Sequence, residues 1–181
     1  MKRSLIALAV PLAMAAFSSR GHAQATMPKT KPMTISDTQI AKVLLTINDG
    51  EIDQAKTAKS HAQNQAVKDF ANMMNDQHQA NTKETKDIAK KNKINPEDSD
   101  LAKSLKEEAK TMNNDLKRQE KMAFDKAYIK DQIAAHEKAL ATLKDTLIPS
   151  AQNPEFKAHL EKTSAAVSEH LAHAKSIEAK L

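Results

Sequence analysis

The stretch from Met122 to Pro149 has the length and the periodicity of one long α-helix. On a 100° helical wheel its large apolar side chains share one stripe, formed by Met122, Ile129, Ile133, Leu140, Leu143 and Leu147. Pro149 marks the expected end of this helix, because proline cannot continue the helical hydrogen bonds. His136 lies near the middle of the stripe. An ionisable ring in an apolar face needs a hydrogen-bond partner or another ligand.

Three further long segments show the same helical period, and each follows a helix-capping signal. These signals are the capping box Ser36 with Gln39, the cap Asn64, and Asn153 before Pro154 and Glu155. They open helices that we expect to run to about 62, to about 92 and from 154 onward. The chain contains only two glycines in 181 residues and no alternating apolar run. The sequence therefore predicts an all-α protein.

The lengths of the connections predict how the four long helices are arranged. Short connections near Gln63 and Pro154 join the first helix to the second and the fourth to the fifth, so each pair forms an antiparallel hairpin. Between the hairpins a shorter third helix, over about 96–118 and opened by Asn95 and Pro96, is expected in the long crossover. Two helical hairpins with one long crossover form a ferritin-like four-helix bundle.

The first 25 residues have the features of a secretory signal peptide. Lys2 and Arg3 precede an apolar run over 5–17, and Ala23-Gln24-Ala25 fits a cleavage site. We therefore predict a signal peptide over 1–25, a flexible lead-in over 26–35 and one helical domain over 36–181. Secretion across the inner membrane would place the mature protein in the periplasm or at the envelope, with no later transmembrane segment. The chain has no cysteine, so stability must come from core packing or from packing and a metal.

Each of the four long helices places one potential metal ligand on its inward face. These ligands are Glu51, His78, His136 and His170. At 1.5 Å rise per residue, all four lie about 16–24 Å from the loop of their hairpin, which is close to mid-bundle. Gln54 and Asn81 lie on the same inward faces and can support such a polar layer. One carboxylate and three imidazoles suit zinc, iron or manganese.

Three stretches resemble a family of secreted bacterial ferritin-like proteins of unknown function, sometimes labelled predicted outer membrane proteins. They are Phe70 to His78, Phe124-Asp125-Lys126-Ala127-Tyr128 running on to His136, and Glu169-His170-Leu171. The resemblance implies a helical ferritin-like fold and an envelope location, and it implies no activity. The paired E-x-x-H motifs of di-iron ferritin-like proteins are missing, since Asn75 and Val167 stand three residues before His78 and His170. A single, histidine-rich metal site fits this departure better.

Charge and motifs exclude several classes of function. Removing Lys2, Arg3 and Arg20 with the signal peptide reduces the formal net charge from +5 to +2, and the chain has one Tyr and no Trp, which argues against a nucleic-acid partner. No H-E-x-x-H motif, glycine-rich phosphate loop or nucleophile elbow is present, so no catalytic residue is predicted.

Three hypotheses remain open from the sequence. The first is a periplasmic protein that binds one transition metal through the Glu/His layer. The second is a non-enzymatic envelope protein for stress tolerance or partner binding, in which the layer is structural. Its docking face would be the apolar face of the third helix, formed by Leu101, Leu105, Met112 and Leu116. The third is a metal-dependent oxidoreductase, which would need open coordination positions. A protein partner or a homo-oligomer fits any of them.

Overall fold

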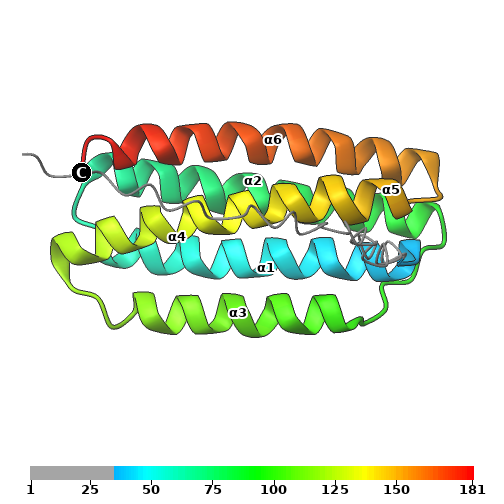
Figure 1. The fold of residues 1–181 in the computed structure, drawn as a ribbon, viewed down its shortest axis with the longest axis horizontal. Coiled ribbons are helices and arrows are strands. Elements are labelled where there is room, and N and C mark those ends of the chain that lie inside the picture. The colour runs from blue at the N-terminus through cyan, green and yellow to red at the C-terminus, as the bar shows by residue number, and fades with distance from the viewer. Residues whose placement is uncertain (1–34) are drawn as a thin grey trace, which may run out of the picture. The chain divides into compact units, whose positions relative to one another are not determined.

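Four long helices form two antiparallel hairpins that pack against each other (Figure 1). The computed structural model describes residues 35–181, so the predicted signal peptide and all of the lead-in except Ile35 lie outside the described residues. The first hairpin is α1 (Asp37–His61) with α2 (Gln65–Lys91), and the second is α4 (Lys121–Thr142) with α6 (Pro154–Glu178). All regular structure within residues 35–181 is helical, which confirms the all-α prediction. The ferritin-like assignment stays a prediction.

The predicted caps open three of the long helices. The Ser36 hydroxyl accepts a hydrogen bond from Gln39 N at 3.3 Å, while the Gln39 side chain accepts one from Ser36 N at 3.2 Å. The side chain of Asn64 accepts from Ala66 N at 2.8 Å, and the side chain of Asn153 accepts from Phe156 N at 2.9 Å. These bonds satisfy backbone donors that a helix N-terminus leaves free.

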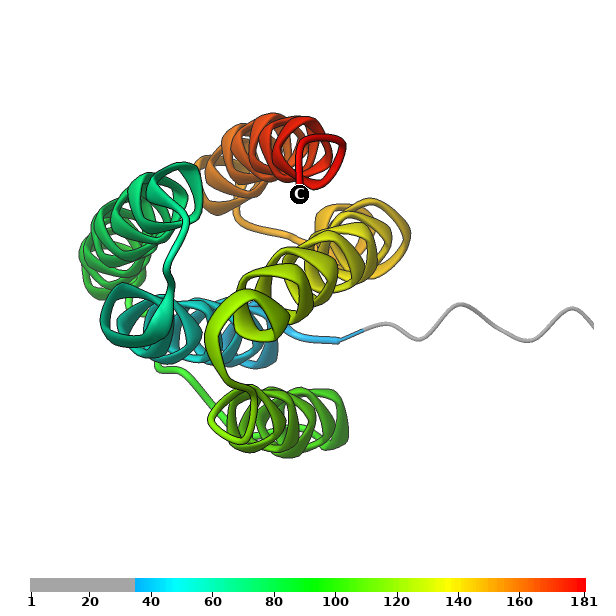
Figure 2. The ribbon, with the colours of Figure 1, turned by 90° about the vertical axis from the view of Figure 1, so that its left-hand side faces the viewer.

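The crossover helix α3 (Asp100–Leu116) begins later than the sequence predicts. Asn95 and Pro96 do not cap it; the Ser99 side chain does, accepting from Ala102 N at 3.1 Å. The reason is that the segment before it crosses the start of α1, where Glu97 N donates to Thr38 O at 3.0 Å. End-on, α3 lies outside the two hairpins, beside α1 and α4 (Figure 2).

The apolar face of α3 packs on the bundle. Leu116 is fully buried, and Leu101 and Leu105 pack against the core, while Met112 is half-buried. This face therefore has a partner within the chain, which removes the sequence-based reason to treat it as a docking surface.

Gly50 explains how closely α3 approaches α1. A Cβ atom at Gly50 would lie 2.7 Å from the Cβ of Ala109 on α3, closer than two carbon atoms can pack. We expect Gly50→Ala to lower the free energy of unfolding by about 1–3 kcal/mol because of this clash. The loss is expected even though alanine normally stabilises a helix by about 1 kcal/mol more than glycine does. Urea denaturation measures this. The double variant Gly50→Ala/Ala109→Gly should recover most of the loss, and no recovery would show that the contact is not the cause.

The fourth long helix differs from the predicted one at both ends. Met122 is 50% exposed rather than part of the buried stripe, because it is the second residue of α4 and lies beside the turn from α3. At the other end the helix widens into the π-helix η1 (Leu143–Leu147) and closes with α5 (Ile148–Ser150). Ile148 N donates to Leu143 O, and Pro149, one residue before the end, has no N–H to offer.

The buried apolar residues form two clusters separated by a polar layer. One cluster includes Leu44, Leu147 and Phe156, and the other includes Phe70, Phe124 and Ile129. Between them on the long helices lie buried polar side chains, namely Asn48, Glu51, Gln54, Asn75, His78, Gln132, His136 and His170. In residues 35–181 no helix is apolar enough over a sufficient length to span a membrane.

Candidate metal centre

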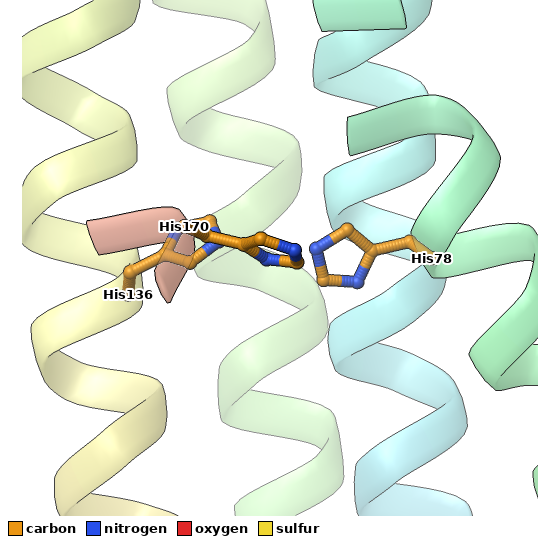
Figure 3. A group of neighbouring side chains, drawn as sticks. All are labelled: His78, His136 and His170. Carbon is orange, nitrogen blue, oxygen red and sulfur yellow. The ribbon is translucent and has the colours of Figure 1, made fainter. Parts of the chain in front are cut away.

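Three of the four predicted ligands converge in the polar layer. His78 on α2, His136 on α4 and His170 on α6 are 4%, 1% and 4% exposed. Their ring centroids lie 5.9, 5.4 and 5.4 Å apart, and one ring nitrogen from each lies within 4.8 Å of the other two. Figure 3 shows the rings pointing toward one another from their three helices. We call these residues the histidine triad.

A chain of hydrogen bonds determines which nitrogen of His78 carries the proton. It starts at a backbone carbonyl, His159 O, which accepts from the Thr163 hydroxyl at 2.9 Å. The Thr163 oxygen therefore accepts from Asn81 Nδ2, and Asn81 Oδ1 accepts from Asn48 Nδ2, both at 2.8 Å. Asn48 Oδ1 then faces His78 Nδ1 at 2.9 Å, so Nδ1–H donates. The lone pair of His78 must lie on Nε2.

The other two histidines are held in the same manner. His136 Nδ1 lies 2.9 Å from the backbone oxygen of Gln132, one turn earlier on α4, which can only accept a hydrogen bond. His170 Nε2 lies 2.6 Å from Gln77 Oε1. The remaining nitrogens, Nε2 of His78 and His136 and Nδ1 of His170, are buried and have no partner. Each ring thus donates outward to an oxygen and has a free lone pair, which is how proteins hold metal-ligating histidines.

Burial and the neighbouring rings lower the pKa values of His78 and His170, which favours their neutral forms. Burial, followed by the proximity of His136 and His170, holds the pKa of His78 well below its usual value of 6.5. Burial lowers the pKa of His170 to about 4, with smaller contributions from His136 and His173. Neutral imidazoles are the form that binds metal ions, because a protonated nitrogen has no lone pair to donate.

Glu51 is the predicted ligand that the structure does not bring into the triad. Its Oε2 accepts a hydrogen bond from Gln132 Nε2 at 2.8 Å, and its Oε1 lies 4.0 Å from His136 Nδ1, the nitrogen that faces outward. The carboxylate also borders a pocket of about 60 Å³ beside α3. The amide of Gln132 therefore holds Glu51 behind His136, where its negative charge can act on the triad through the ring.

The predicted supporting residues lie beside the triad. Gln54 Oε1 accepts from Gln132 Nε2 at 3.4 Å, and Asn81 belongs to the chain that orients His78. Sequence reasoning missed Asn48, Gln77 and Gln132, which hold the rings. One signal was available for Gln132: it precedes His136 by four residues, which places both side chains on one face of a helix.

Without bound metal, the protein should lose stability as the pH falls from about 6.5 to about 4. The pKa of His170 is lowered in the folded state, so the unfolded chain binds more protons in this window. Its contribution is complete above the unfolded pKa of 6.5 and disappears as the pH reaches about 4, a change of about 3 kcal/mol at 1.36 kcal/mol per pKa unit. Urea denaturation at several pH values measures it. His170→Gln should give a smaller slope, and equal slopes would contradict the assignment.

A comparison with known protein families identifies the family of this chain. Residues 22–177 match the family described as "Domain of unknown function (DUF4142)". The protein belongs to this family. The match includes all three histidines of the triad, so the candidate site lies within the DUF4142 region. A comparison with curated proteins found no match.

A solved structure, described as "CopM in the Cu(II)-bound form", is similar to this DUF4142 protein. The two share a TM-score of 0.65 and 17% sequence identity, and the similarity covers 82% of this chain and 99% of that chain. At this level of identity the likeness shows a shared fold.

Proposed function

We propose that this DUF4142 protein binds one transition-metal ion through His78, His136 and His170. One observation carries the proposal: the three rings converge, and each has one buried nitrogen without a partner while its opposite nitrogen donates to an oxygen. A purely structural spacer would be expected to pair these nitrogens, since a buried polar atom without a partner costs about 1–3 kcal/mol. A bound metal ion would satisfy all three lone pairs together.

The spacing of the nitrogens fits a metal ion after a small adjustment. Ligands at 2.0–2.1 Å from one ion lie about 3.3–3.6 Å apart in trigonal or tetrahedral geometry. The candidate ligand atoms lie within 4.8 Å of one another, so movements of about 1 Å would complete the site. Three protein ligands also leave at least one coordination position open, as in many zinc sites that bind water or substrate.

The donor set narrows the choice among metals. The sequence favours zinc, iron or manganese, but the clustered donors are all imidazole nitrogens, which suit zinc and copper better than manganese. Divalent copper binds nitrogen sites more tightly than the other first-row ions do. The similar structure is a Cu(II)-bound form of CopM, which supports testing copper first.

The proposal gives Glu51 an indirect role, in which it acts on the bound ion through the ring of His136. A carboxylate near the ring of a metal ligand stabilises the positive charge of the bound ion. Glu51 Oε1 lies 4.0 Å from His136 Nδ1, and the side chain is buried. We therefore assign Glu51 to charge compensation, while Gln54 and Asn81 hold the surrounding amides in place.

The same proposal includes a location and an architecture. Residues 1–25 would direct secretion across the inner membrane, and the helical domain over 36–181 would handle its metal in the periplasm or at the envelope. The two hairpins joined through α3 match the connectivity of ferritin-like bundles with one long crossover. No reaction is assigned to the site.

Elemental analysis of the mature protein, purified without a histidine tag, tests the proposal. We expect about one equivalent of transition metal after incubation with copper or zinc and removal of loosely bound ions. Bound metal should also raise the melting temperature, because it binds the folded state alone. Protein that takes up no copper, zinc, iron or manganese would contradict the proposal and favour a structural polar layer.

A further inference from the structure

A pocket between α2 and α6 connects the triad with the protein surface. Its volume is about 210 Å³, and His78 and His170 form part of its wall. Small side chains from both helices, Ala80 and Ala166, also border it. The half-exposed Glu84 belongs to the same wall, about 9 Å along α2 from His78 at 1.5 Å rise per residue. The pocket therefore gives ions a route toward the triad.

A fourth buried histidine lies beside Glu84, outside the triad. His159 is 4% exposed, and its Nε2 lies 2.9 Å from the Thr85 hydroxyl oxygen. That hydroxyl donates its own proton to Asn81 O at 2.7 Å, so His159 Nε2 must be the donor toward it. The lone pair of His159 therefore lies on Nδ1, which is buried and has no hydrogen-bond partner.

The free nitrogen of His159 faces a carboxylate rather than a hydrogen-bond donor. His159 Nδ1 lies 3.6 Å from Glu84 Oε1. Burial lowers the pKa of His159 more strongly than Glu84 raises it, so the ring is neutral near pH 7. A lone pair and a carboxylate repel each other unless a cation lies near both. A separation of 3.6 Å is close to that of two ligands on one metal ion.

In the structure, Lys162 supplies the positive charge beside the Glu84 carboxylate. Its Nζ lies 3.0 and 3.1 Å from the two oxygens of Glu84. The Lys162 side chain is 71% exposed, so it can move into solvent and release the carboxylate. An exposed ion pair of this kind adds little stability, so a divalent cation can displace the lysine from the carboxylate.

We propose that Glu84 and His159 form an outer cation site that captures a divalent transition metal and passes it along the pocket to the triad. The role in delivery rests on the proposed function, but the existence of the outer site does not. Two protein ligands with water would bind weakly and exchange quickly, as a transfer site requires. The triad, with three buried imidazoles, would bind more tightly and retain the ion.

Zinc titration of triad variants tests whether the outer site exists. His136→Ala removes one triad ligand, and we expect it to retain one weakly bound Zn²⁺. Glu84→Gln in that background should weaken this remaining site at least tenfold. Equal zinc binding by His136→Ala and His136→Ala/Glu84→Gln, or no zinc binding by His136→Ala, would overturn the proposal. Circular dichroism melting establishes that each variant is folded.

Rates of zinc uptake test the role in delivery. In otherwise wild-type protein, Glu84→Gln should slow loading of the triad about tenfold without changing its equilibrium affinity, whereas Lys162→Gln should accelerate loading. Unchanged rates in both variants would overturn delivery through Glu84. Wild-type protein that lacks a tight site, while His136→Ala still binds zinc through Glu84, would refute the proposed function and leave the outer site standing.

Discussion

Replacing His136 by alanine should abolish tight metal binding while the helical fold remains. The substitution removes one of three converging nitrogens and leaves the ion with two protein ligands. Loss of a residue that merely orients a ligand costs about 10- to 100-fold in affinity, so loss of a ligand should cost at least 100-fold. Competition with a chelator of known affinity measures the change. One equivalent of metal, which fills only a tight site, should then raise the melting temperature of the wild type but not of His136→Ala.

Two matched variants make this result specific to the triad. His173 is exposed on α6, three residues after His170, and lies against the ring of Phe70 rather than in the triad. His173→Ala should therefore keep wild-type affinity. Asn48→Ala removes the acceptor that orients His78 and should weaken binding about 10-fold. Wild-type affinity in His136→Ala, or an equal loss in His173→Ala, would contradict the assignment.

Replacing Asp125 by alanine should cause a large loss of stability, far from the triad. Asp125 at the start of α4 is fully buried, and its carboxylate accepts from Gln63 N at 3.0 Å and from Asn64 N at 2.8 Å. It therefore ties the second hairpin to the loop of the first. Two backbone donors left without partners cost about 2–5 kcal/mol together, which lowers the melting temperature by about 5–15 °C. Thermal and urea denaturation measure both quantities.

Asp37 provides the control, because it connects the first hairpin to the loop of the second hairpin. At the start of α1 its carboxylate accepts from Gln152 N and Asn153 N, both at 2.9 Å, in the loop before α6. Asp37 is half-buried, so water can replace it more readily than it can replace Asp125. Asp37→Ala should lower stability by about 1 kcal/mol. A smaller loss in Asp125→Ala than in Asp37→Ala would refute the argument from burial.

The sequence predicts the helices well because their signals are local. The caps at Ser36, Asn64 and Asn153 each bind backbone donors within three residues, and the structure confirms all three. The start of α3 could not be predicted in this manner. Asn95 and Pro96 have the local features of a helix start, but the backbone bond from Glu97 to Thr38 on α1 holds the segment extended.

The candidate site could also be predicted only as far as local sequence signals reach. Rise per residue places His78, His136 and His170 at one height, and the structure brings these three together. Glu51 lies at the predicted height too, but the amide of Gln132, on another helix, holds its carboxylate behind His136. Such contacts depend on side-chain orientation across helices, which periodicity does not contain.

X-ray absorption spectroscopy of the protein loaded with one equivalent of copper tests the central claim most directly. The spectrum reports the number, type and distance of the atoms around the metal. We expect three imidazole nitrogens at about 2.0 Å, and fewer imidazoles in the spectrum of His136→Ala. A wild-type first shell without three histidines, or a spectrum unchanged in His136→Ala, would show that the metal binds elsewhere and that the triad is not its site.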